Sequence, residues 1–95
     1  YIDYYQNEDY PNEPLNIGGL VTLEHIYSYE PYTPKLTKEQ CGYIMGVQAN
    51  VWGEFIHHPD KVNYMAYPRA MALSEIGWSP AEKKNYADFR ERLAG

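Results

Sequence analysis

The nine residues from Gly46 to Glu54 alternate in a way that restricts the folds open to this chain. Valine and alanine occupy every second position, and the positions between carry two amides, an indole and a carboxylate: Gln48, Asn50, Trp52 and Glu54. Successive side chains of a strand point to opposite faces, so this pattern predicts a β-strand with one apolar and one polar face. Amide, indole and carboxylate groups together suit a sugar better than they suit bulk water.

The first third of the chain is expected to hold a strand end, a loop and a helix. Residues 1–5 are apolar and aromatic and read as the end of a strand, and residues 6–19, rich in Asn, Glu and Pro, read as a long loop. The apolar spacing of residues 20–29 predicts a short amphipathic helix, with Thr22 as its N-cap.

Two further helices are expected on either side of the predicted strand. Thr37 and Gln40 form a capping-box pattern that opens a short helix, which ends near Met45. After the strand, a helix is expected over residues 60–76, with Pro68 bending or restarting it because proline lacks the N–H that a helix interior needs.

The C-terminal segment carries the strongest helix-start pattern of the chain. Ser79 supplies a cap, a proline follows in the first turn, and Glu82 stands at the third helical position. We expect one helix from this point to about Leu93. Trp78 is expected to lie in the core between the last two helices.

The order of these elements indicates an α/β fold. A sequence of strand, loop, helix, strand and helix at this spacing argues for parallel strands covered by helices. Parallel sheets are covered on both faces or closed into a barrel, and a strand with one polar face fits the barrel. Polar groups at the C-terminal end of such a strand lie where barrel enzymes keep their active sites.

Composition excludes some function classes. The net charge is −5, from 13 acidic and 8 basic residues without a basic cluster, which argues against a nucleic-acid or anionic-membrane partner. No apolar run approaches the roughly 18 residues of a membrane-spanning helix. Cys41 is the only cysteine, so no internal disulfide is possible, and a partly buried helical thiol is favoured over a nucleophile. His57, His58 and Asp60 are interpreted as a helix entry rather than a metal site, so no metal or cofactor is predicted.

Several separated stretches resemble the C-terminal part of the glycoside hydrolase family 20 β-N-acetylhexosaminidases: Tyr1–Asp3, Gly46–Glu54, Tyr67–Ala70 and Gly77–Pro80. Residues 14–19 and 21–29 resemble the bacterial branch of that family, so the resemblance covers nearly the whole chain. It implies that residues 1–95 are a fragment of the catalytic domain, namely the C-terminal quarter of a (β/α)8 TIM barrel with about two parallel strands and their covering helices.

The resemblance also implies an activity and a set of site residues. The family removes terminal N-acetylhexosamine residues with retention, using the acetamido oxygen of the substrate as the nucleophile. Tyr1 matches the tyrosine that holds this oxygen, Asp3 and Glu54 match the acids that bind the sugar hydroxyls, and Trp52 matches a wall of the sugar pocket. The Asp-Glu pair that contains the general acid has no counterpart here, so the isolated fragment is expected to be inactive. Gly53 departs from many relatives, which carry a side chain there.

The implied partners are an N-acetylhexosamine-containing oligosaccharide or glycan and the remainder of the same barrel. A periplasmic, cell-surface or secreted location is expected from the family. Two alternatives stay open: a non-catalytic carbohydrate-binding module that uses the same aromatic residues, and a structural segment that self-associates through open strand edges. Without the resemblance, packing and ligand binding are about equally favoured as the role of Trp52 and of Glu54.

Two groups of residues have structural interpretations. The tyrosines within or beside helices are expected to pack rather than to bind sugar: Tyr27, Tyr29, Tyr43, Tyr64, Tyr67 and Tyr86. For Tyr4, Tyr5 and Tyr10, packing and shaping the rim of a substrate site are about equally favoured. Arg69 is expected to form an ion pair with an acid such as Glu75 or with a residue upstream of this chain.

Overall fold

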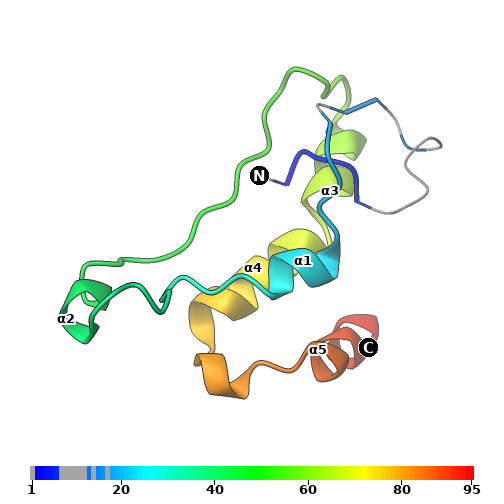
Figure 1. Cartoon of the computed structure of the whole chain (residues 1–95). Coiled ribbons are helices and arrows are strands. Elements are labelled where there is room, and N and C mark those ends of the chain that lie inside the picture. The colour runs from blue at the N-terminus through cyan, green and yellow to red at the C-terminus, as the bar shows by residue number, and fades with distance from the viewer. Residues whose placement is uncertain (1, 7–12, 14, 17) are drawn as a thin grey trace.

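The computed structural model describes residues 2–6, 13, 15–16 and 18–95. Their helices, drawn in Figure 1, follow the chain in this order: α1 (Leu23–Tyr27), α2 (Lys38–Cys41), α3 (Pro59–Ala66), α4 (Arg69–Trp78), the 3-10 turn η2 (Ala81–Lys83) and α5 (Tyr86–Ala94). Helix α1 packs against α4, and α3 contacts the beginning of α4.

The first two helices begin at the expected residues. The Thr22 hydroxyl accepts a hydrogen bond from the backbone N–H of His25 at 3.1 Å. Thr37 and Gln40 form the full capping box, in which each side chain accepts from the backbone N–H of the other residue. Both helices are shorter than expected, because α1 ends at Tyr27 and α2 ends after one turn at Cys41.

The helix expected over residues 60–76 is two helices, with the restart at Pro68 that the sequence predicts. Tyr67 leaves the helical conformation after its N–H donates to the Asn63 carbonyl oxygen at 2.9 Å. Pro68 has no N–H to continue the ladder, and α4 starts at the next residue with Met71 donating back to the Pro68 carbonyl oxygen.

The prediction that the last helix starts at Ser79 is wrong. The segment after Ser79 makes only the 3-10 turn η2, and α5 begins at Tyr86, where the Asn85 side chain accepts from the Asp88 N–H. The reason is tertiary: the Lys84 ammonium donates to the backbone carbonyl oxygens of Tyr27 and Tyr29, at the end of α1, at 3.1 and 2.9 Å, and residue 84 is extended.

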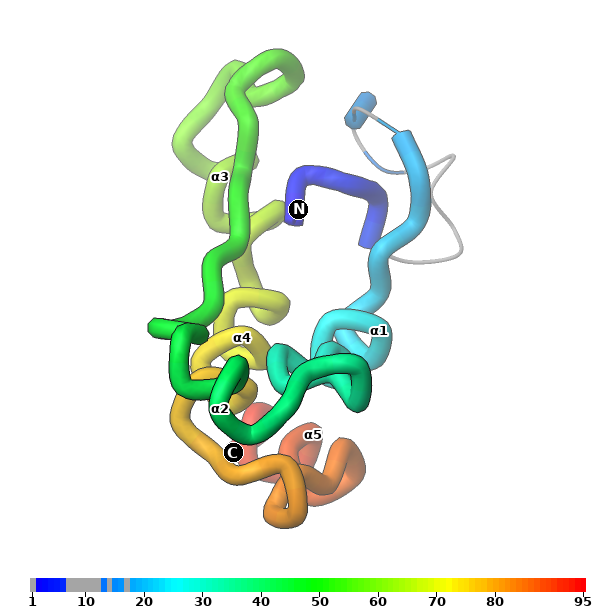
Figure 2. The backbone as a smooth tube through the Cα atoms, turned by 60° about the vertical axis from the view of Figure 1, so that its left-hand side comes forward, coloured from blue at the N-terminus to red at the C-terminus, as the bar shows by residue number. Residues whose placement is uncertain are grey.

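None of the described residues belongs to a β-strand, so the two parallel strands expected from the sequence do not form here. Residues 2–5 lie between two other extended segments (Figure 2). On one side Tyr5 forms a parallel bridge with Leu20, and on the other the Ile2 N–H donates to the Asn50 carbonyl oxygen at 2.9 Å. Residues 46–52 of the predicted strand are extended, but a strand requires a hydrogen-bond ladder, and this segment shares one backbone bond with residues 2–5.

The core is small and lies where α1, α4 and α5 meet. Tyr27, Ala72 and Phe89 are its buried members, and the Tyr27 and Phe89 rings stack with their centroids 4.8 Å apart. Trp78 is 90 % exposed, so the prediction that it lies in the core is wrong. It is the last residue of α4, and α5 packs its aromatic face against Tyr27 instead.

The chain has more exposed surface than a compact protein of its length. Its accessible area is 7104 Å², whereas the size scaling of compact monomers gives about 5,700 Å². The radius of gyration is 14.8 Å, against about 12 Å for a compact chain of this length. Large apolar side chains, Met45 and Tyr43 among them, are exposed by 101 % and 79 %.

Candidate functional site

Asp3 and Trp52, two of the residues singled out from the sequence, lie together. The Asp3 side chain is 5 % exposed, and its Oδ2 accepts from the backbone N–H of Trp52 at 3.3 Å. Its second oxygen, Oδ1, is buried and has no hydrogen-bond partner among the described residues. A buried carboxylate oxygen without a donor is costly, so this atom is suited to accept from a ligand hydroxyl.

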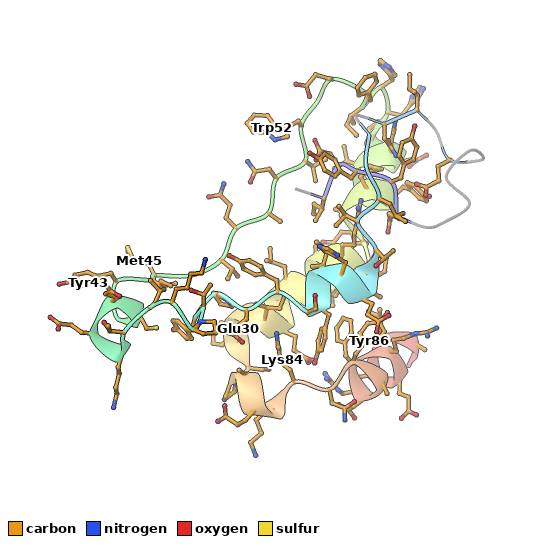
Figure 3. All side chains as sticks on the ribbon, viewed as in Figure 1. Glu30, Tyr43, Met45, Trp52, Lys84 and Tyr86 are labelled. Carbon is orange, nitrogen blue, oxygen red and sulfur yellow. The ribbon has the colours of Figure 1, made fainter. Side chains whose placement is uncertain are left out.

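The alternation predicted for residues 46–54 is present in part, at Val47, Gln48 and Asn50, although no strand forms. The Gln48 side chain donates to the Asn50 side chain at 2.9 Å, which places both amides on one face. Val47 faces the other way, since a Cβ added to Gly77 of α4 would lie 3.2 Å from Val47 Cγ2. The Trp52 side chain, 49 % exposed, points away from α3 and α4 (Figure 3). One face of this segment therefore packs toward the helices and the other carries the polar and indole groups.

Glu54 lies at a turn just after this segment. The Ile56 N–H donates to the Gly53 carbonyl oxygen at 3.1 Å, which makes Glu54 and Phe55 the two central residues of the turn. The Glu54 side chain is exposed. A Cβ added to Gly53 would meet nothing within 4 Å, so there is room for a side chain at this position.

Arg69 lies beneath Asp3 and is fully buried, with 0 % exposure. Its guanidinium donates to backbone carbonyl oxygens of Ile2, Tyr4, Val21 and Met65. The expected ion pair with Glu75 is wrong. Desolvation by burial lowers the pKa of Arg69 to about 10, while the nearby carboxylates of Glu13 and Asp3 favour its charged form.

Glu75 belongs to a second polar cluster near the C-terminus. Its Oε2 accepts from the Tyr27 hydroxyl at 2.6 Å, and its Oε1 lies 2.6 Å from the Arg92 guanidinium. The Tyr27 hydroxyl in turn accepts from the Asn85 N–H at 2.9 Å. Burial and the hydrogen bond to Glu75 raise the pKa of Tyr27. This cluster joins α1, α4 and the beginning of α5.

The structure also shows where the tyrosines and the cysteine singled out from the sequence lie. Tyr1 and Tyr10 lie outside the described residues. Tyr27 and Tyr86 pack as expected, with ring centroids 5.6 Å apart. Tyr64 is 39 % exposed, and burial together with a hydrogen bond to Glu13 raises its pKa to about 12, so it is partly packed. The other helix-associated tyrosines are exposed, so their predicted packing role is wrong in this structure: Tyr29, Tyr43 and Tyr67. Cys41 is the expected partly buried thiol at the end of α2.

His57 and His58 are exposed and lead into α3, as the helix-entry interpretation expects, and α3 begins at Pro59, one residue before the predicted start. Together with Leu15, Phe55, Asp60, Lys61 and Tyr64 they line a cavity of about 460 Å³. The Lys61 ammonium donates to the carbonyl oxygens of Leu15 and Phe55. It thus connects the segment before α1 to the turn that contains Glu54 and Phe55. In the described part of the chain, no three His, Cys, Asp or Glu side chains gather as a group able to hold a metal ion.

A larger cavity, about 710 Å³, lies between residues 46–49 and helices α1 and α4, beside the close approach of Val47 to Gly77. Its lining is mainly apolar and includes Ile2, Ile26, Val47, Leu73 and Ile76. The apolar face of the extended segment therefore lines an open space and is only partly packed.

The buried position of Arg69 has a signal in the sequence, although the ion pair expected for Arg69 did not take it into account. Met65, Arg69, Ala72 and Ile76 are spaced by four, three and four residues, and all four are buried. An arginine in the apolar stripe of a helix must find acceptors inside the protein. The spacing could have identified Arg69 as buried, but it does not identify the acceptors.

No helix in the part of the chain that the structure describes has the length and apolar character needed to cross a membrane.

The family model described as "Glycosyl hydrolase family 20, catalytic domain" matches residues 1–81. A protein of Porphyromonas gingivalis named beta-hexosaminidase is 42% identical over 93 residues, which are 98% of this chain and 12% of that protein.

Other relatives give the same picture. A beta-hexosaminidase of Akkermansia muciniphila is 42% identical over 73 residues, or 77% of this chain and 15% of that protein. A beta-N-acetylhexosaminidase of Cellulomonas fimi is 30% identical over 82 residues, or 84% of this chain and 16% of that protein. The chain thus spans only a small part of the length of the curated relatives it matches.

Proposed function

Because the chain belongs to the catalytic-domain family of glycosyl hydrolase family 20, we propose that the whole protein is an exo-acting β-N-acetylhexosaminidase. The similar proteins named beta-hexosaminidase support this activity. The substrate is an oligosaccharide or glycan with a terminal N-acetylhexosamine, and residues 1–95 contribute part of the pocket that binds this sugar.

The observation that carries the proposal is the buried carboxylate of Asp3. One of its oxygens accepts from the Trp52 N–H, and the other has no partner among the described residues. Carboxylates form strong charge-assisted hydrogen bonds with sugar hydroxyls. Trp52 adds an indole that can cover the C–H face of a sugar, and Glu54 adds a second carboxylate two residues later.

In the proposed reaction, the acetamido oxygen of the substrate attacks the anomeric carbon while the glycosidic bond breaks, and the leaving oxygen takes a proton from the general acid. Water then attacks the anomeric carbon of the oxazolinium intermediate, which restores the acetamide and retains the configuration. This belongs to the substrate-assisted exceptions to the two-carboxylate scheme. Tyr1 holds the acetamido oxygen in line for attack, which lowers the barrier by fixing a near-attack geometry. The general acid belongs to a part of the protein outside this chain.

The proposed fold context is the C-terminal quarter of a (β/α)8 barrel. In that setting residues 2–5 and 46–54 are neighbouring strands, which the backbone bond from Ile2 to Asn50 favours. The exposed apolar side chains and the 710 Å³ cavity are then covered by the remainder of the barrel. A strand with one polar face suits the inside of such a barrel at its catalytic end.

The test is turnover of a chromogenic N-acetylglucosaminide by the whole protein and its variants. We expect Tyr1→Phe to lower kcat about 100-fold with little change in KM, because the lost hydroxyl acts in the chemical step. Glu54→Ala and Trp52→Ala should chiefly raise KM, Glu54→Ala by about 10-fold or more, since a charge-assisted hydrogen bond is lost.

Glu82→Ala, which removes an exposed carboxylate in η2, is the matched control and should leave both constants unchanged. Wild-type protein without turnover would reject the proposed activity. Equal kinetics for wild type and the three site variants would reject the assigned roles.

A further inference from the structure

Arg69 is the most deeply buried charge among the described residues. Its side chain has 0 % exposure. Its Nε and Nη2 both donate to the Met65 carbonyl oxygen, at 3.2 and 2.6 Å, which anchors the guanidinium to the last turn of α3. Its Nη1 also donates to the Val21 carbonyl oxygen at 3.1 Å, just before α1. The guanidinium is therefore bound both to the end of α3 and to the segment just before α1.

The two remaining bonds reach the backbone on either side of Asp3. Nη2 donates to the Ile2 carbonyl oxygen at 2.6 Å, and Nη1 donates to the Tyr4 carbonyl oxygen at 3.0 Å. The planar fork of an arginine presents these donors in a fixed geometry, which a flexible lysine ammonium does not reproduce. The backbone of residue 3 is thus held from both ends by one rigid group.

Packing alone does not require a charge at this position. Burial disfavours the guanidinium charge and lowers its pKa, yet Arg69 remains protonated at neutral pH because that pKa is about 10. An apolar side chain in the same helical stripe would fill the space without this cost. What the arginine adds is the set of fixed hydrogen bonds to residues 2 and 4.

Resting on the proposed function, we infer that Arg69 is a positioning residue for sugar recognition. It fixes the backbone of residues 2–4, so that the Asp3 carboxylate keeps its bond to the Trp52 N–H and offers Oδ1 to a sugar hydroxyl. Arg69 itself touches no substrate. It acts through Asp3, and the loss of its bonds displaces that carboxylate.

The test compares Arg69→Lys, Asp3→Asn and the double variant in the whole enzyme. A displaced binding group costs about 100-fold when the misplacement reaches 1 Å, so we expect Arg69→Lys to lower kcat/KM about 10- to 100-fold. The larger part of the change should be in KM, because the Asp3 carboxylate binds a hydroxyl. If Arg69 acts through Asp3, the double variant should lose little more than the worse single variant.

Tyr27→Phe is the control for a general loss of stability, since it removes hydrogen bonds of the distant cluster around Glu75. All variants are measured below their melting temperatures, at a matched distance from Tm. The inference is overturned if Arg69→Lys loses no more kcat/KM than Tyr27→Phe, or if the losses of Arg69→Lys and Asp3→Asn multiply in the double variant.

A crystal structure of the wild-type enzyme with a bound N-acetylhexosamine gives a second test that needs no variant. The guanidinium should donate to the Ile2 and Tyr4 carbonyl oxygens while the Asp3 carboxylate contacts the sugar, and a guanidinium elsewhere overturns the inference. Failure of the proposed function is distinct, because it appears as wild-type protein that neither turns over nor binds the sugar.

Discussion

Tyr27 shows at the residue scale how one side chain connects distant parts of this chain. Its ring stacks on Phe89 of α5, and its hydroxyl donates to Glu75 of α4 and accepts from the Asn85 N–H. The hydroxyl thus serves as donor and acceptor in one place. The neutral phenol is favoured, because burial and the bond to Glu75 raise its pKa.

Replacing Tyr27 with phenylalanine should destabilise the fold in a pH-dependent way. Near pH 7 the loss should be about 1–3 kcal/mol, because the Asn85 N–H and the Glu75 carboxylate lose a partner. The folded pKa lies above the unfolded value of 10.0, so the stabilisation is complete below pH 10 and is lost as the pH rises through the folded pKa. Urea unfolding of both proteins between pH 7 and 11.5 measures this. A difference that stays constant across that range would contradict the assignment.

At the scale of elements, the helix starts fall into two kinds. The caps of α1 and α2 are local, with donor and acceptor three residues apart. The start of α5 is set from outside, because Lys84 and Asn85 are held by contacts with Tyr27 and Tyr29. Because of these contacts, the helix-start pattern at Ser79, although stronger locally, leads only to the 3-10 turn η2.

Asn85→Ala should therefore destabilise the chain, while Ser79→Ala should not. The Asn85 side chain accepts from the Asp88 N–H at 3.1 Å, and loss of an N-cap costs about 1 kcal/mol. Ser79 is the C-cap residue of α4 through its backbone N–H, which donates to the Glu75 carbonyl oxygen and is kept in alanine, and its side chain starts no helix. Urea midpoints of the two variants against wild type give the comparison. A larger effect at Ser79 than at Asn85 would show that the helix starts where the sequence pattern put it.

At the scale of the whole molecule, the chain is open and its apolar surface is incompletely covered. The exposed Trp78, Met45 and Tyr43 and the cavity beneath residues 46–49 leave much of the expected packing unmade. Among the described residues, the extended segment after Gly46 also shares a backbone hydrogen bond with residues 2–5 alone and has no strand partner on its other side. Such surfaces favour association with further chain, or with other copies, over an independent compact domain.

We expect the 95-residue chain alone to hydrolyse no N-acetylglucosaminide, and to restore activity when combined with the remainder of the parent protein expressed separately. This expectation rests on the proposed function, in which the remainder supplies the general acid and the chain supplies sugar-binding groups. An Asp3→Asn chain is the matched control: it should still join the remainder in size-exclusion chromatography but restore far less hydrolysis. Turnover by the chain alone, unaffected by Glu54→Ala, would reject the whole assignment.

The sequence predicted the features that depend on near neighbours along the chain. These are the caps at Thr22 and Thr37, the restart at Pro68 and part of the alternation of residues 46–54. It also predicted the family, which the comparisons confirm. It placed Trp78 in the core wrongly and expected two strands, because burial and strand pairing depend on neighbours distant in the sequence or outside these residues.

The sequence by itself determined the caps at Thr22 and Thr37 and the break at Pro68, since such a cap or break needs partners only three or four residues away. Only the tertiary structure decided that Arg69 holds the backbone around Asp3 and that the Asp3 carboxylate meets the Trp52 N–H. The acceptors of Arg69 in residues 2–4 lie 65 to 67 positions away, and Asp3 and Trp52 are 49 apart. Backbone carbonyls are the same in every residue, so no side-chain pattern can identify the ones that a buried arginine will bind.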